Sequence, residues 1–260
     1  MKTEPLLVTT ADGVATIVIN RPARKNAVTQ AMWIEIAALV DGLSVDPAVR
    51  VIVLRGAGHD FSAGADIGEF DTLRGDAESA RAYEATNSAA FAALRNAPVP
   101  VIAAIRGICF GGGFGLAAAC DLRIATADAQ FAVPAARLGL AYPQDAMGDI
   151  VWAAGEQMAR YLTYTAGRID AQAALSAGFL LEIVDADRFE ARIDEIARTI
   201  ARNAPLSVRA SKAAIRAALS HDPAEAEAAQ AAGDATFLSD DYAEGRAAFH
   251  GRRTPVFKGR

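Results

Sequence analysis

A chain of 260 residues can bury a substantial core as one large domain, alone or with an appendage. Its net charge of −5 gives no electrostatic basis for binding nucleic acid, and its apolar runs are too short to span a membrane. The first residues form no apolar signal segment, so we expect a cytoplasmic protein. Cys109 and Cys120 lack metal-ligand spacing, so we expect no metal site.

The chain begins with a predicted β-hairpin over residues 6–19, because Asp12-Gly13 suits the positive φ angles of a tight turn. Thr29 is placed to cap a helix that runs to about residue 45. A buried strand over 49–55 follows it.

Residues 56–66 form a glycine-interrupted loop between that strand and a helix near 67–73. Such a loop can present backbone N–H groups at the start of the helix. Ser62 does not fit the G-x-S-x-G nucleophile pattern, because Asp60 stands where the first glycine is required.

A second loop of the same design follows a predicted helix over 76–96 and a buried strand over 101–105. Gly111, Gly112 and Gly113 allow close approach of a ligand to the backbone, and an apolar helix continues to Cys120. If their strands are neighbours, the two loops can direct N–H groups at one carbonyl oxygen.

Three interpretations of this second loop remain open. It can serve close packing alone. It can be a dinucleotide site, because residues 113–118 fit G-x-G-x-x-A, although no acidic residue follows at the required distance. It can be an oxyanion hole, with the second donor from the loop over 56–66. A P-loop is excluded, because no Lys-Ser or Lys-Thr pair follows the glycines.

Beyond the second loop, strands and helices alternate up to residue 186, and then only helices are predicted. We therefore divide the chain into a core, 1–186, and a helical C-terminal region, 187–260. The predicted strands are 122–125, 130–133 and 179–184, and the predicted helices are 146–154, 156–165, 169–178, 189–203, 206–219, 223–238 and 240–249.

Six short motifs occur in a characteristic order, and together they resemble the crotonase superfamily, the enoyl-CoA hydratase/isomerase family. The resemblance extends from about residue 6 to residue 258. The motifs are Asn20-Arg21-Pro22 with Asn26-Ala27, Phe61-Ser-Ala-Gly-Ala-Asp66, Gly111-Gly-Gly113, Ala119-Cys-Asp121, Leu138-Gly139, and Asp240 to Gly245 with Phe249.

This resemblance implies an α/β fold, a spiral of β-β-α units with a C-terminal helical region for trimerisation. It also implies a trimer or a dimer of trimers that binds an acyl-CoA thioester, with coenzyme A as part of the substrate and no separate cofactor. The two amides of the family's oxyanion hole fall on Ala65 and Gly112. Its CoA contacts fall on Arg24, Ala63, Asp66 and Ile67 and, from the neighbouring subunit, on Phe249 and Arg252.

The sequence departs from the family at two catalytic positions. The two glutamates of the hydratases fall on Gly115 and Ala135, which cannot transfer protons. The interval of 20 residues between them, 135 − 115, is the family's own, so a shifted alignment does not explain the loss. Water addition by the usual mechanism is therefore not expected.

Two side chains in the following loop are candidates to replace the glutamates. Tyr142 falls where decarboxylase-like members of the superfamily have a tyrosine, and Asp145 lies two residues beyond the position of the dehalogenase aspartate. Glu69 is a third candidate. The sequence leaves open an isomerase or another enolate-forming enzyme, a methylmalonyl-CoA-decarboxylase-like lyase, and a non-catalytic acyl-CoA-binding scaffold.

Overall fold

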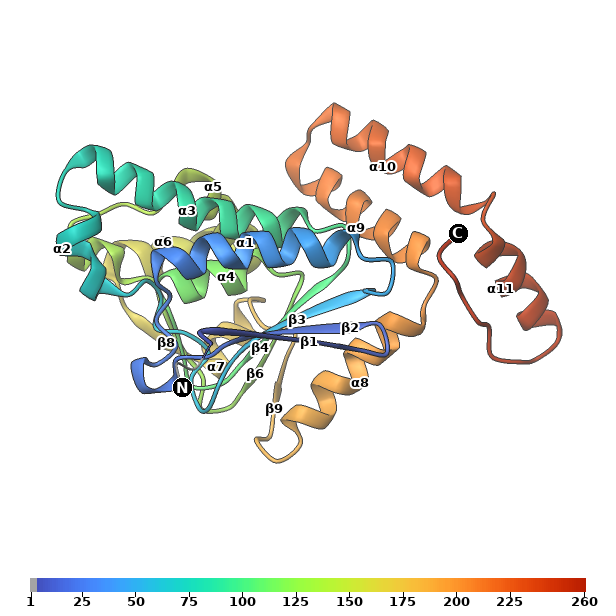
Figure 1. The fold of residues 1–260 in the computed structure, drawn as a ribbon, viewed down its shortest axis with the longest axis horizontal. Coiled ribbons are helices and arrows are strands. Elements are labelled where there is room, and N and C mark those ends of the chain that lie inside the picture. Colours follow the sequence, from blue (N-terminus) through green and yellow to red (C-terminus); the bar gives the residue numbers. More distant parts are fainter. Residues whose placement is uncertain (1–3) are drawn as a thin grey trace.

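The computed structural model describes residues 4–260, and a six-stranded sheet lies at its centre (Figure 1). The strand order is β1-β2-β3-β4-β6-β9, antiparallel between β1 and β2 and parallel elsewhere. The strands are β1 (Leu6–Ala11), β2 (Val14–Ile19), β3 (Val51–Gly56), β4 (Val101–Ile105), β6 (Leu122–Thr126) and β9 (Glu182–Val184).

The predicted hairpin is confirmed, and Asp12 and Gly13 have φ angles of 53° and 82° in its turn. Strands β3 and β4 are neighbours and run parallel, with Ile52 opposite Val101. Their carboxyl ends therefore lie at the same edge of the sheet, which is the condition for their two loops to meet.

A second sheet of three strands, in the order β5-β7-β8, supports the glycine loop. Strand β5 (Ile108–Phe110) pairs in parallel with β7 (Gln130–Ala132), which pairs antiparallel with β8 (Arg168–Asp170). The sequence did not predict β5. It wrongly extended a helix back to Ile169, which lies in β8, because the helix α7 begins only at Ala171.

Helices cover both faces of the central sheet, as expected for strands that are apolar on both sides. Ile52 and Leu54 of β3 point into the larger core, and Val51 and Val53 into the smaller one. In Figure 1, helices α1, α3 and α4 lie over one face and α8 under the other. The helices of this part are α1 (Gln30–Val45), α2 (Phe70–Leu73), α3 (Ala77–Asn96), α4 (Gly112–Ala119), α5 (Gln144–Ala154), α6 (Glu156–Thr165), α7 (Ala171–Ser176) and α8 (Phe189–Arg202).

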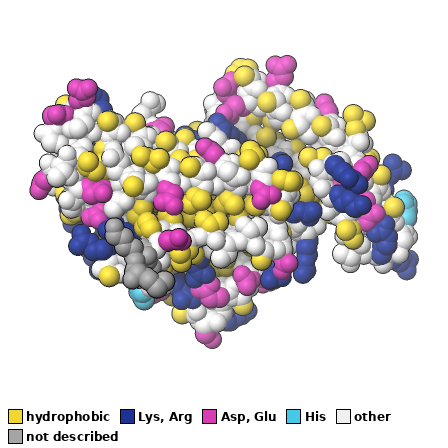
Figure 2. Space-filling model, viewed as in Figure 1, with side chains coloured by type: hydrophobic (Ala, Val, Ile, Leu, Met, Phe, Trp, Pro, Cys, Tyr) yellow, Lys and Arg dark blue, Asp and Glu magenta, His cyan; other side chains and the backbone are white. Residues whose placement is uncertain are grey.

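Three further helices extend away from this body: α9 (Pro205–Ser220), α10 (Pro223–Thr236) and α11 (Asp240–His250). Figure 2 shows a notch between them and the rest of the molecule. The sequence assigned α8 to this region, but α8 packs on the sheet through Phe189 and Ile193. The division after residue 186 stays a prediction.

The C-terminal tail folds back on α11. The Asp241 carboxylate accepts hydrogen bonds from the N–H groups of Lys258 and Gly259, at 2.6 and 2.8 Å. Arg50, at the start of β3, donates to the Phe257 carbonyl at 2.7 Å and so joins the tail to the sheet. Among residues 4–260, no helix combines the length and the hydropathy that crossing a membrane requires.

Candidate functional site

The two glycine loops meet at the carboxyl ends of β3 and β5. Gly64 has a φ of +91°, and a Cβ built on it would lie 2.8 Å from the Gly112 nitrogen. A Cβ built on Gly112 would lie 3.4 Å from the Ala65 nitrogen. The absence of a side chain at Gly64 is thus what allows the two backbones to come this close, whereas a Cβ on Gly112 would clash with the Trp33 ring, at 2.8 Å.

Ala65 and Gly112 each present a backbone N–H at this junction. Gly112 is the first residue of α4, so its N–H has no acceptor within the helix. Around Ala65, the Gly64 carbonyl and the Asp66 N–H are both bonded to Val28. Within the described chain, neither the Ala65 N–H nor the Gly112 N–H donates a hydrogen bond to another backbone group.

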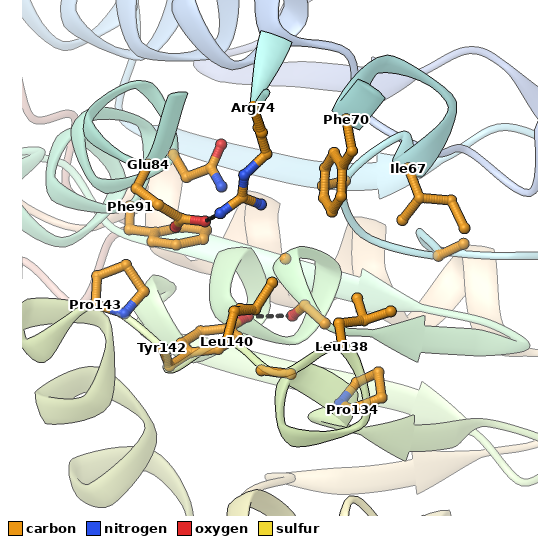
Figure 3. Close-up of a pocket in the computed structure, with 16 residues that line it drawn as sticks. Ile67, Phe70, Arg74, Glu84, Phe91, Pro134, Leu138, Leu140, Tyr142 and Pro143 are labelled. Carbon is orange, nitrogen blue, oxygen red and sulfur yellow. Dashed lines mark hydrogen bonds and ion pairs between the residues drawn. The ribbon is translucent and has the colours of Figure 1, made fainter. Parts of the chain in front are cut away.

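Both residues line a cavity of about 110 Å³ (Figure 3). This volume is smaller than the ~150 Å³ cavity that holds one benzene molecule, so the cavity suits a short acyl group. Its walls come from the two loops, from α2 and α3, and from the segment after β7. The lining residues beside Ala65 and Gly112 are Ala63, Ile67, Phe70, Arg74, Glu84, Asn87, Phe91, Gly111, Pro134, Ala135, Leu138, Leu140, Tyr142 and Pro143.

Tyr142 lies in this wall, and its hydroxyl donates a hydrogen bond to the Gly111 carbonyl (Figure 3). The Gly111 carbonyl and the Gly112 N–H belong to one peptide unit, so this bond fixes and polarises the amide of Gly112. Burial, followed by the nearby charge of Glu84, raises the pKa of Tyr142 far above its ordinary value. The phenol is therefore neutral, and its proton is engaged in the bond to Gly111.

Phe91 fills the space that a side chain at position 115 would need. A Cβ built on Gly115 would lie 2.7 Å from Cζ of the Phe91 ring and 3.1 Å from the Tyr142 hydroxyl. Ala135 does line the cavity. The two positions thus differ. A side chain at position 115 would require Phe91 to repack, whereas position 135 already carries a Cβ and belongs to the cavity wall.

The other two acid-base candidates do not line the cavity. Asp145 is exposed in the first turn of α5, and one of its carboxylate oxygens accepts a hydrogen bond from the Ser88 hydroxyl at 3.3 Å. The Glu69 carboxylate accepts from the Gln30 N–H at 2.8 Å and so caps the first turn of α1. Both carboxylates thus contact neighbouring helices instead.

Two of the four CoA contacts predicted in the first loops line the cavity. Ala63 and Ile67 line it, and Asp66 lies between them in sequence. The Asp66 carboxylate forms ion pairs with Arg21 at 2.9 Å and with Arg24 at 3.4 Å. Burial favours a higher pKa for Asp66, but the hydrogen bonds from Arg21, the Gly68 N–H and Arg24 outweigh it and hold the pKa below its ordinary value.

Phe249 and Arg252 are not brought to this cavity within one chain. Phe249 is 83% exposed on α11, at the end of the molecule opposite α2 in Figure 1. Arg252, with a φ of 49°, follows α11 and is also exposed. The predicted role of Phe249 and Arg252 is at the site of a neighbouring subunit, so it depends on assembly of several chains and stays a prediction.

Three polar side chains in the cavity wall were not foreseen from the sequence: Arg74, Glu84 and Asn87. Glu84, Asn87 and Phe91 are spaced i, i+3 and i+7, so they share one face of α3. The sequence feature that could have identified them is the presence of polar residues on the inward face of an amphipathic helix.

The sequence profile of the family described as "Enoyl-CoA hydratase/isomerase" matches residues 9–260 of this chain. A protein of Syntrophomonas wolfei named crotonyl-CoA hydratase is 33% identical over 259 residues, which cover 99% of each chain. A mitochondrial Δ(3,5)-Δ(2,4)-dienoyl-CoA isomerase of Dictyostelium discoideum is 30% identical, over 94% of this chain and 87% of its own.

Solved structures resemble the fold over its whole length. A crystal structure described as an enoyl-CoA hydratase/carnithine racemase from Magnetospirillum magneticum superposes with a TM-score of 0.92 and 36% identity, covering 100% of this chain and 97% of that one. The likeness includes both sheets and the C-terminal helices, since no part of the chain is left uncovered.

Proposed function

Because the chain belongs to the enoyl-CoA hydratase/isomerase family, we propose that it binds an acyl-CoA thioester and stabilises the thioester enolate with the Ala65 and Gly112 amides. The observations that support this proposal are that Ala65 and Gly112, on adjoining loops, both line a cavity sized for a short acyl group, and that the N–H of neither donates to another backbone group of the described chain. Coenzyme A enters as part of the substrate, and no separate cofactor is needed.

The proposed chemistry follows from where charge develops. Enolate formation moves negative charge onto the thioester oxygen, so two fixed amides stabilise the transition state more than the ground state. The loss of one such donor typically lowers the rate by a factor of about 10²–10³. Tyr142 contributes by holding the Gly111–Gly112 peptide in place.

The reaction differs from two-glutamate hydration in its proton transfer. Gly115 and Ala135 supply no acid or base, and Phe91 occupies the space beside Gly115. Glu84 and Tyr142 are the side chains of the cavity wall with a carboxyl or a phenol group, within the residues that the structure describes. We place isomerisation, or another step through an enolate, ahead of water addition.

Exchange of the α-hydrogens of a saturated acyl-CoA with D2O tests the proposal directly, because it requires only that an α-proton is lost to form the enolate and that a deuteron from solvent returns to the α-carbon. We expect exchange of butyryl-CoA at a rate well above that of buffer. A broad panel of acyl-CoA thioesters then identifies the reaction. If neither α-hydrogen exchange nor turnover is found with any thioester, the enzymatic role is contradicted. The acyl-CoA-binding scaffold is then the function that remains.

The lyase alternative rests on Tyr142 lining the cavity, which suits a carboxylate held beside the forming enolate. It requires the phenol to leave its bond to Gly111 or to act through its lone pairs. Release of propionyl-CoA from methylmalonyl-CoA, lost in Tyr142→Phe, would support it. Asp145→Asn is the matched control, because Asp145 lies outside the cavity wall.

We further propose that the protein acts as a trimer or a dimer of trimers, in the cytoplasm, with Phe249 and Arg252 completing a neighbour's CoA site. The apolar groove between α9 and the body, which includes Trp152 and Ile215, supports an assembly surface in this region. We expect Arg24→Glu and Arg252→Glu to weaken CoA binding in calorimetry. Equal weakening in a verified monomer would contradict the role of Arg252 between subunits.

A further inference from the structure

Glu84 supplies a carboxylate to the wall of the cavity from α3. The Arg74 guanidinium donates a hydrogen bond to Oε1 of this carboxylate (Figure 3). The other oxygen, Oε2, accepts no hydrogen bond from residues 4–260 and keeps accessible surface, and the Glu84 side chain is 25% exposed. One oxygen of Glu84 is thus held by the protein, and the other is available to a molecule in the cavity.

Arg74 is itself held in place, so it fixes the position of the carboxylate. Its side chain is 10% exposed, and its guanidinium lies 4.4 Å from the centroid of the Phe70 ring and 5.2 Å from that of the Tyr83 ring. Contacts of this kind between a cation and aromatic rings are favourable, and more so where water is partly excluded. A carboxylate that is oriented in advance loses little freedom when it meets a reactant.

Tyr142 does not compete with Glu84 as a base. Burial and then the charge of Glu84 raise the pKa of Tyr142 far above its ordinary value, so the phenol stays neutral with its proton bonded to the Gly111 carbonyl. This influence also places the charge of Glu84 within electrostatic range of the Gly111–Gly112 peptide. Among residues 4–260, no other carboxylate lines the cavity.

We propose that Glu84 is the base that removes the α-proton of the bound thioester and that Arg74 positions it for this step. The inference rests on the proposed acyl-CoA function and adds the residue that moves the proton.

The step is balanced within the site. The bond between the α-carbon and its hydrogen breaks, and an O–H bond forms at Oε2 of Glu84. The electron pair of the broken bond forms the carbon–carbon double bond of the enolate, and the carbonyl π pair moves onto the thioester oxygen. Negative charge thus passes from Glu84 to that oxygen, and Arg74 remains in the same wall as a cation. Return of the proton to a different carbon of a conjugated acyl chain moves the double bond.

Exchange of the α-hydrogens of butyryl-CoA in D2O, followed by NMR, tests the assignment together with the dissociation constant from calorimetry. We expect Glu84→Gln to slow exchange by a factor of about 10²–10⁴, because the base is lost. We expect its dissociation constant to stay within about three-fold of that of wild type, because the amides that bind the thioester remain. Glu78→Gln is the matched control, since Glu78 is an exposed acid in the first turn of the same helix.

Two further variants cover the case that Glu84→Gln fails to fold because Arg74 has lost its partner. The double variant Arg74→Gln/Glu84→Gln removes both charges and leaves two amides that can bond each other. We expect it to bind butyryl-CoA and to show no exchange above buffer. Glu84→Asp keeps the charge but withdraws the carboxylate by one methylene, and we expect exchange to slow about ten-fold or more with binding retained.

Exchange at the wild-type rate in any of these three Glu84 variants would overturn the assignment of Glu84 and leave the acyl-CoA function intact. If the wild-type protein itself neither exchanges nor turns over any thioester, the proposed function fails, and the role of Glu84 fails with it. The wild-type measurement therefore separates the two failures.

Discussion

The Tyr142 phenol donates to the carbonyl of Gly111, and that carbonyl shares a peptide unit with the N–H of Gly112, a residue that lines the cavity. We expect Tyr142→Phe to slow α-hydrogen exchange about ten-fold, because the amide loses a polarising bond, with little change in KM. Tyr164→Phe, at an exposed position on α6, is the control. A change confined to KM would show that Tyr142 serves substrate binding instead.

Gly112 itself offers a second prediction. A Cβ at this position would lie 2.8 Å from the ring of Trp33, which is fully buried. We expect Gly112→Ala to cost about 1–3 kcal/mol of stability in urea unfolding and to lower the exchange rate about 10²-fold through displacement of the amide.

Gly148→Ala is the matched control for this change, because a Cβ there meets nothing within 4 Å inside α5. It is expected to stabilise the protein slightly, by about 0.5–1 kcal/mol. Equal effects of the two substitutions would show that the contact with Trp33 does not position Gly112.

The residues of the site were predictable to different degrees. Ala65 and Gly112 stand in glycine-rich loops, so the sequence could predict that these two loops approach each other closely. Glu84 and Asn87 lie on a helix whose periodicity shows which face is inward, but not that a cavity lies in front of it. Whether a polar residue on a buried face meets solvent, a partner or a ligand depends on elements distant in sequence.

Helices α3 and α4 are coupled at the contact between Phe91 and Gly115. We expect Gly115→Ala to cost about 1–3 kcal/mol in wild type and clearly less in a Phe91→Leu background, a coupling of about 1 kcal/mol. Urea unfolding of the four proteins of the double-mutant cycle measures it. Gly233→Ala in α10, where a Cβ meets nothing within 4 Å, should show no such dependence on Phe91.

Among the helices and strands, the best predicted are those whose ends are determined by residues close together in the sequence. The hairpin turn at Asp12-Gly13 and the cap of α3 at Asp76, whose carboxylate accepts from the Ser79 N–H at 2.8 Å, are fixed by neighbouring residues. Strands β5 and β8 have three residues each and are held by pairing with β7. Such short strands carry too little periodicity to be recognised without their partner.

For the whole molecule, Asp149 predicts a pH dependence of stability. Its carboxyl is 3% exposed, and burial raises its pKa to about 6, although Arg95 at 2.5 Å pulls in the opposite direction. The folded state therefore binds the proton more tightly than the unfolded state does. The resulting stabilisation is complete below pH ~4 and is lost as the pH rises through about 6.

We expect the stability of wild type relative to Asp149→Asn to fall by up to about 3 kcal/mol between pH ~4 and ~7, a value that follows from a shift of about two pKa units. Denaturant unfolding at several pH values measures the difference, and Asp222→Asn, at an exposed helix cap, is the control. A difference that grows with pH would contradict the raised pKa.

The packing of the Phe91 ring against Gly115 also bears on how this protein can evolve. A variant that acquired a glutamate at position 115 while the ring remained would carry an overfilled interior, and one that first replaced Phe91 by a smaller residue would carry a void with no catalytic gain. Each single step is disadvantageous, so both substitutions would have to arise together before a glutamate could become established at position 115. The Phe91 ring thus opposes the evolution of a carboxylate at position 115.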